Sequence, residues 1–402
     1  MTENINRRQF LSAVLGVGAT AAFGGTNAFL NTGNCQPEGN VSALPLPKQR
    51  KLIVILFGGG TRSSESIDDP THRYIPHLWN EMIPKATLFT NMRVEHKVVH
   101  PNSAGSILTG HWEWDDIDWT RPVANPTIFE ICRRARRAPD TSAWAFVYAS
   151  ILAKTGESLD PAYGKDYAAN VVEPPTIPRT TAEQMDRLMQ QAASLGSADA
   201  EAKAAAACAR LARRTSHISV DGLHSKEARK FLDDEYTKWK AGTGTTSHDA
   251  FLTDRAIACM HTFAPDVMAV DFGEIDCAHY GSWSRYVEAI RRTDELTWRL
   301  WRAAEEIEQY RGQTLMLILP DHGRELDRPN HWGFIHHSNF YTDEGADEGC
   351  RRVWMVALGP GVKARYRIEK PVPITAAAAT GLEYLGLDVS AGAEKSVWNL
   401  IT

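Results

Sequence analysis

Short runs of mostly apolar residues recur along the chain. Each run is five or six residues long, and a continuous apolar run is typical of a strand that is buried on both faces of a sheet. The runs occupy residues 52–57, 145–149, 267–272, 314–319 and 353–358. Stretches with apolar residues at helical spacing lie between them, at 75–83, 127–137, 283–310 and 374–385. This alternation predicts an α/β domain over residues 51–402 with a mostly parallel sheet.

One stretch, residues 151–250, differs from the rest of the domain. A proline-rich loop at 174–178 leads into alanine-rich segments between 182 and 212, and alanine has the highest helix propensity. We predict that residues 151–250 form a helical insertion or cap on the edge of the sheet where ligands bind.

The N-terminus has the pattern of an export signal. The pair Arg7-Arg8 is followed by a weakly apolar run of small residues at 12–24, as in a twin-arginine signal peptide. The run is shorter than the ~20 residues of a transmembrane helix. We therefore predict a signal peptide over 1–30, a linker over 31–50, export to the periplasm by the twin-arginine machinery, and no stable membrane anchor.

The composition narrows the classes of function. Hydrophobic residues make up 43% of the 402 residues and charged residues 23%, which is enough apolar material for a large core. Lys plus Arg number 44 against 49 Asp plus Glu. The chain therefore lacks the basic excess that drives nucleic-acid binding, and we expect no nucleic acid as a partner. The six cysteines include no Cys-x-x-Cys pair, which disfavours a thiolate metal site.

Carboxylates and imidazoles gather directly after predicted strands or close to them. Ligands of open α/β sheets bind at the carboxyl ends of the strands, so these side chains are expected at one edge. Three segments carry them, 271–281, 320–324 and 331–339. The candidate metal ligands are Asp276, His279, Asp321, His322, His336 and His337. An Asp-His dipeptide after a strand is also typical of a turn or a helix cap. Together, however, the segments predict one or two divalent ions, zinc first, with manganese, calcium or magnesium as alternatives.

The order of the motifs resembles the alkaline phosphatase superfamily, which includes the sulfatases. The motifs are a Gly-rich turn after the first strand, Thr-Gly, Asp-x-x-His, Asp-His-Gly and His-His, at 58–60, 109–110, 276–279, 321–323 and 336–337. Residues 317–323 are the most specific piece, and the resemblance spans residues 51 to 390. It implies a three-layer α/β sandwich and a metal-dependent hydrolase. The implied substrate is a small anionic ester of phosphate or sulfate.

The resemblance also implies a role for each candidate ligand. Asp276 and His279 would hold one metal, although the family places its Asp and His one residue further apart. The third ligand of that metal would be His337 or His336.

A second metal would be held by Asp321 and His322. The family also uses an Asp at the end of the first strand for this metal, and this chain has glycines at 58–60 instead. Glu65, a few residues on, is the candidate substitute.

The nucleophile of sulfatase-type members is a Ser, a Thr or a modified Cys, ten residues before the glycine of the Thr-Gly pair. Counting back from Gly110 leads to His100, and an imidazole can attack phosphorus or ligate a metal. A shift of register would instead make Ser103 the nucleophile, at a helix N-terminus that favours a bound anion. Arg62, in a catalytic role, and Arg324, in substrate binding, are expected to hold the oxygens of the ester.

Two functions stay open at this point. The cluster of Asp and His residues favours an exported hydrolase. The glycines at 58–60 and the histidine at position 100 favour a catalytically degenerate member that binds an anionic ligand or a partner protein.

Overall fold

The structure is a computed structural model, and it describes residues 49–116, 118–242, 247–278, 283–326, 348–390 and 392–402. Three predicted features lie outside these ranges: the signal peptide at 1–30, most of the linker at 31–50, and the candidate ligands His279, His336 and His337.

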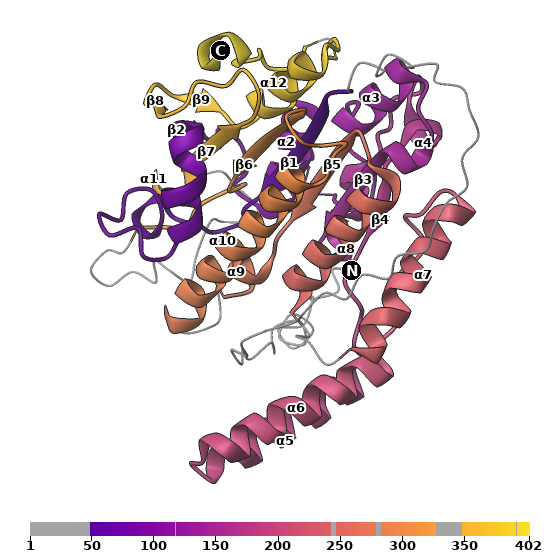
Figure 1. The fold of residues 1–402 in the computed structure, drawn as a ribbon, viewed down its shortest axis with the longest axis vertical. Helices are drawn as coiled ribbons and strands as arrows, with labels where there is room; N and C mark the ends of the chain where they lie inside the picture. The colour runs from indigo at the N-terminus through magenta and orange to yellow at the C-terminus, as the bar shows by residue number, and fades with distance from the viewer. Residues whose placement is uncertain (1–48, 117, 243–246, 279–282, 327–347, 391) are drawn as a thin grey trace, which may run out of the picture.

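A central sheet organises the described part of the chain (Figure 1). Its strands are β1 (Lys51–Leu56), β2 (Thr87–Arg93), β3 (Ala143–Val147), β4 (Asn170–Val172), β5 (Val267–Asp271), β6 (Thr314–Leu319), β7 (Arg352–Leu358), β8 (Tyr366–Ile368) and β9 (Val372–Pro373). They follow the order β4–β3–β5–β1–β6–β7–β2–β8, and β9 pairs with β2. β7 runs antiparallel to β6 and β2, whereas the other pairings are parallel. The predicted α/β fold with a mostly parallel sheet is confirmed.

Helices connect the strands. Their bounds are α2 (His100–Thr109), α3 (Ile128–Arg136), α4 (Gly164–Tyr167), α5 (Arg179–Ser194), α6 (Ala198–Thr215), α7 (Lys226–Ala241), α8 (His248–Phe263), α9 (Glu274–Cys277), α10 (Trp283–Glu306), α11 (Glu348–Arg351), α12 (Ala376–Leu385) and α13 (Trp398–Ile401). The expected helix at 75–83 is reduced to a π-helical turn over Leu78–Met82. Within the described ranges, no helix combines bilayer-spanning length with sufficient apolarity.

The central strands are apolar throughout because helices cover both faces of the sheet. Successive side chains of a strand point to opposite faces. In β1, Ile53 and Ile55 belong to the core formed with α8 and α10, which cross the near face in Figure 1. Leu52 and Val54 belong to the core formed with α2, α3 and α12 on the other face. The result is the three-layer sandwich that the resemblance implied.

The register of the sheet brings four strand ends to one edge. Leu56, at the end of β1, is aligned with Asp271 of β5 and with Leu319 of β6. Val147, at the end of β3, is aligned with Asp271 as well. The residues that follow these strands therefore meet at this edge, which is where open α/β sheets bind ligands.

Residues 151–250 contain both helices and a piece of the sheet. β4 pairs with β3 at the end of the sheet, so the predicted insertion includes one strand. α5 and α6 lie side by side and extend away from the sheet (Figure 1). They share a small core of Met185, Cys208 and Ala212.

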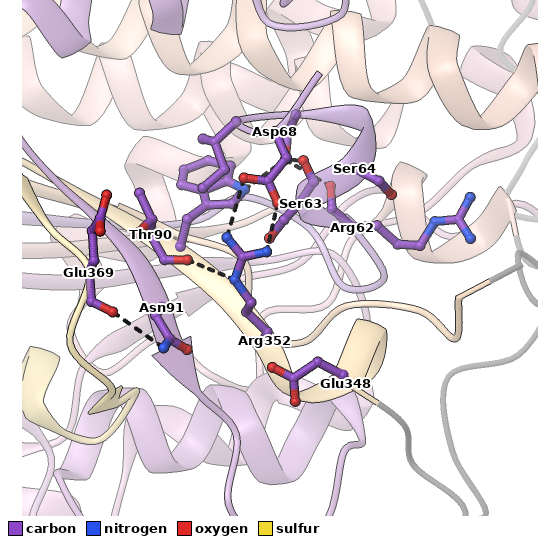
Figure 2. A network of polar contacts seen from close by, with 12 residues as sticks. Arg62, Ser63, Ser64, Asp68, Thr90, Asn91, Glu348, Arg352 and Glu369 are labelled. Carbon is purple, nitrogen blue, oxygen red and sulfur yellow. Dashed lines mark hydrogen bonds and ion pairs between the residues drawn. The ribbon is translucent and has the colours of Figure 1, made fainter. Parts of the chain in front are cut away.

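The side chain of Arg352, the first residue of β7, connects the loop after β1 to strand β2. Figure 2 shows its guanidinium beside the carboxylate of Asp68, at N–O distances of 2.6 and 3.2 Å, while its Nε donates to the carbonyl of Thr90 in β2 at 3.0 Å. The side chain of Arg62 points away from this network (Figure 2). Arg352 thus links the loop to β2 and β7.

Gly323, in the Asp-His-Gly motif, provides a test of this packing. A Cβ at this position would lie 1.9 Å from the carbonyl oxygen of Gly349, which is backbone and cannot rotate away. We expect Gly323→Ala to lower the free energy of unfolding by about 1–3 kcal/mol, the usual cost of overpacking. Chemical denaturation measures it. Gly242→Ala is the control, because its nearest contact would be 3.3 Å, and an equal loss in both variants would contradict the prediction.

Candidate metal centre

The candidate site consists of residues that follow the aligned strand ends or begin a helix beside them. His100 is the first residue of α2, and Asp271 is the last residue of β5. Asp276 lies on the short helix α9, and Asp321 and His322 follow β6. All five are buried, with Asp321 and His322 at 0% exposure. The fold therefore brings together residues that are distant in the sequence: His100 and His322 are 222 positions apart.

The distances within this cluster are short. Nδ1 of His100 lies 2.7 Å from Oδ2 of Asp321, and Nε2 of His322 lies 3.6 Å from the same oxygen. Oδ1 of Asp276 lies 3.9 Å from Nε2 of His322. One nitrogen or oxygen each from His100, Asp321 and His322 falls within 4.8 Å of the other two. Such a group is compact enough to surround one metal ion.

The orientation of His322 suits a metal ligand. Its Nδ1 lies 2.9 Å from the carbonyl oxygen of Gly323, and in the tautomer in which Nδ1–H donates there, the lone pair stands on Nε2. The backbone N–H of Gly60 also lies 3.2 Å from Nδ1, but it makes its shorter bond, 2.9 Å, to the carbonyl of His322. A backbone carbonyl that accepts from the second ring nitrogen is a common feature of metal-binding histidines.

The charges in the cluster shift the pKa of two residues. Burial opposes a positive charge on His100, but the carboxylates of Asp321 and Asp271 outweigh this cost, so the pKa of His100 lies well above its usual value. Burial raises the pKa of Asp271, and Asp321 and Asp276 raise it further against the opposing effect of His100. The cluster therefore favours a positive charge in its centre.

Tyr148 also belongs to the site, although the sequence analysis counted it as part of the apolar run at 145–149. Its hydroxyl lies 3.5 Å from Oδ2 of Asp276, and its ring meets the ring of His100 edge to face, with 4.9 Å between centroids. Burial raises the pKa of Tyr148 well above the usual value, so the phenol stays neutral and donates to Asp276. Gly273 leaves room for the Tyr148 ring, because a Cβ at that position would lie 2.0 Å from it. The position of Tyr148 directly after a strand at this edge was the available signal.

Arg62 and Glu65 lie in a separate buried network. Nε and Nη2 of Arg62 bind the two carboxylate oxygens of Glu65 at 2.6 and 3.1 Å, and Nη1 donates to the carbonyl of Glu325 at 2.9 Å. The hydroxyl of Tyr286 donates to the same carboxylate at 3.1 Å. The two charges neutralise each other, so this geometry does not support the predicted catalytic role of Arg62. Nor does it support Glu65 as a substitute for the first-strand Asp.

The guanidinium of Arg324 binds backbone carbonyl groups inside the protein. Its side chain is fully buried, and it donates from Nε to the carbonyl of Gly60 at 2.8 Å and from Nη2 to the carbonyl of Ile275. The guanidinium carbon also lies 4.8 Å from the centre of the Tyr286 ring. Arg324 therefore fastens the turn after β1 to α9, and the substrate-binding role predicted for it stays a prediction.

Ser103, the other predicted nucleophile, lies one turn after His100 in α2. It is 1% exposed, and its hydroxyl makes no hydrogen bond with the described residues. Of the predicted metal ligands, the structure thus groups Asp276, Asp321 and His322 with His100.

The sequence matches no protein-family model and no curated protein. Solved structures do match in three dimensions. A phosphonate monoester hydrolase from Silicibacter pomeroyi has a TM-score of 0.51 at 14% identity, over 89% of this chain and 77% of that one. A mutant of the alkaline phosphatase PafA has a TM-score of 0.51 at 12% identity, over 90% and 100%. A 2-O GAG sulfatase has a TM-score of 0.51 at 10% identity, over 88% and 74%.

Matches at such low identity establish the fold and leave the activity open. The order of the motifs predicted the same fold from the sequence. This chain has the fold of the alkaline phosphatase and sulfatase superfamily.

Proposed function

We propose that this protein is a hydrolase of phosphate or sulfate esters that depends on a divalent metal ion bound to Asp321 and His322. The carboxylate of Asp321 carries the proposal. It is fully buried, and neither oxygen accepts a hydrogen bond from a described residue. The contact of Oδ2 with Nδ1 of His100, although 2.7 Å long, lacks the direction of a hydrogen bond. Burying several carboxylates around one imidazole is costly unless further positive charge compensates them, and a metal ion would supply it.

Gly59 adds a second observation that supports this proposal. A Cβ at Gly59 would lie 2.6 Å from Nε2 of His322 and 2.7 Å from Nδ1 of His100. Two ring nitrogens therefore converge on a place that only glycine leaves open. This is the geometry expected beside a bound ion.

The type of ligand favours zinc. Imidazole nitrogens together with a carboxylate are typical zinc ligands, whereas calcium and magnesium prefer oxygen ligands alone. Manganese, which accepts both types, is the second choice.

The surrounding residues suit a reaction at an anionic ester. A bound divalent ion would polarise an ester oxygen or lower the pKa of a water molecule. α2 begins at His100, so the positive end of its dipole faces the cluster and favours the negative charge of the substrate. The burial of Asp321 and His322 lowers the local dielectric constant, which strengthens these charge interactions.

Turnover tests the proposed function directly. We expect the purified, zinc-loaded protein to hydrolyse at least one ester in a panel of p-nitrophenyl phosphate, p-nitrophenyl phenylphosphonate and p-nitrophenyl sulfate. Asp321→Asn should lower kcat/KM by about a hundredfold or more, because loss of a ligand weakens the metal site.

Asp254→Asn is the matched control, because Asp254 lies on α8 in a half-exposed ion pair with Arg299. It should keep kcat/KM within about twofold, as expected for a surface pair. A protein that binds zinc firmly but hydrolyses none of these esters would contradict the proposal and favour the degenerate binding protein.

The space beside Gly59 gives a separate prediction. Gly59→Ala should weaken zinc binding by about tenfold or more, because the methyl group would displace the rings of His100 and His322. Competition with a fluorescent chelator measures the affinity, and Gly242→Ala serves as the control. Unchanged affinity in Gly59→Ala would mean that zinc binds elsewhere.

We also propose export to the periplasm by the twin-arginine machinery, supported by Arg7-Arg8 and the run at 12–24. Replacing both arginines by lysine should retain the full chain in the cytoplasm, as cell fractionation would reveal. Equal periplasmic levels of the two forms would exclude this route.

A further inference from the structure

We infer that His100 is a ligand of the metal ion and not the nucleophile, and that Asp271 fixes the ring tautomer that makes it a ligand. The inference rests on the proposed function for the presence of the ion. It assigns a new part to the residue at which the resemblance places the covalent nucleophile.

The hydrogen bond to Asp271 determines which ring nitrogen of His100 is available. Nε2 lies 3.1 Å from Oδ1 of Asp271, in hydrogen-bonding geometry. A carboxylate only accepts, so Nε2 carries a proton. A ligand ring is neutral, so when a metal ion takes the place of the second proton, the lone pair stands on Nδ1. The position of Asp271 is fixed, because it is 3% exposed and ends a central strand that is paired on both sides. Asp271 therefore determines which nitrogen of His100 carries the proton.

Nδ1, in turn, faces the metal candidates. It lies 2.7 Å from Oδ2 of Asp321, and it borders the open place beside Gly59 that Nε2 of His322 also borders. A lone pair directed at this place is used for ligation and is not free to attack an ester. His100, Asp321 and His322 then form a set of two imidazoles and one carboxylate, which is typical of catalytic zinc sites that keep a further position open.

The arrangement makes Asp271 a positioning residue. A carboxylate that accepts from the second nitrogen of a ligating histidine fixes the tautomer and the plane of the ring, and its loss typically weakens metal binding by about 10- to 100-fold. With His100 used as a ligand, and unless Ser103 attacks in its place, hydrolysis is a single displacement. The oxygen of water bonds to phosphorus or sulfur, the bond to the leaving oxygen breaks, and a proton of the water ends on the leaving alcohol.

Zinc affinity, measured by chelator competition on the full-length folded protein, tests the inference without any need for turnover. We expect His100→Ala to bind zinc about a hundredfold or more weakly, and Asp271→Asn about 10- to 100-fold more weakly. His111→Ala is the matched control: His111 follows the other end of α2 and contacts Ser390, so its affinity should stay within about twofold of wild type. The visible spectrum of the cobalt(II) protein should also lose intensity in His100→Ala.

The near-isosteric Asp271→Asn, together with His100→Asn, keeps the test valid if His100→Ala does not fold. Wild-type zinc affinity in a folded His100 variant would overturn the inference, even if esters are hydrolysed. Zinc binding that depends on His100 in a protein without ester hydrolysis would support the inference and overturn the proposed function alone. A wild-type protein that takes up no zinc, manganese or cobalt would overturn both.

Discussion

Three carboxylates, Asp271, Asp276 and Asp321, lie together in the interior of this protein, and their mutual repulsion is the constraint on which the site depends. All three are at least nine-tenths buried, where water cannot screen them. His100 lies between two of them, at 3.1 Å from Asp271 and 2.7 Å from Asp321. The sheet can hold this arrangement only if positive charge, from a proton or a metal ion, is present in its centre.

The strands that carry the site were predictable because burial on both faces leaves a run of mostly apolar residues. β1, β3, β5, β6 and β7 all have this signal. β2 lacks it, because polar residues such as Thr87 are buried within it and bonded to backbone, here to the carbonyl of Lys363 at 2.8 Å. β4, β8 and β9 are only two or three residues long. Their pairing depends on neighbours distant in the chain, which a local pattern does not contain.

The same reasoning explains which site residues the sequence could identify. Asp321 and His322 follow a strand end, and the rule for parallel sheets places them at the ligand edge. The sequence alone does not show which groups the arginines contact, because the partner of a charged side chain depends on the fold. Glu65, three positions from Arg62, neutralises it inside a tight turn. The contact that orients His100 comes from Asp271, 171 positions away, and only the register of the folded sheet creates it.

The glycine at 59 and the histidine at 100 are coupled by the space that they share. An imidazole at the start of α2 needs more room than a hydroxyl, and Gly59 provides it, since a Cβ there would lie 2.7 Å from Nδ1. The turn is held in place, because Nε of Arg324 donates to the carbonyl of Gly60 at 2.8 Å and the backbone N–H of Gly60 donates to the carbonyl of His322 at 2.9 Å. An aspartate at position 59 would therefore collide with His100 before it could reach a metal. If His100 is a ligand, as inferred above, its imidazole takes the space that a carboxylate side chain at position 59 would need.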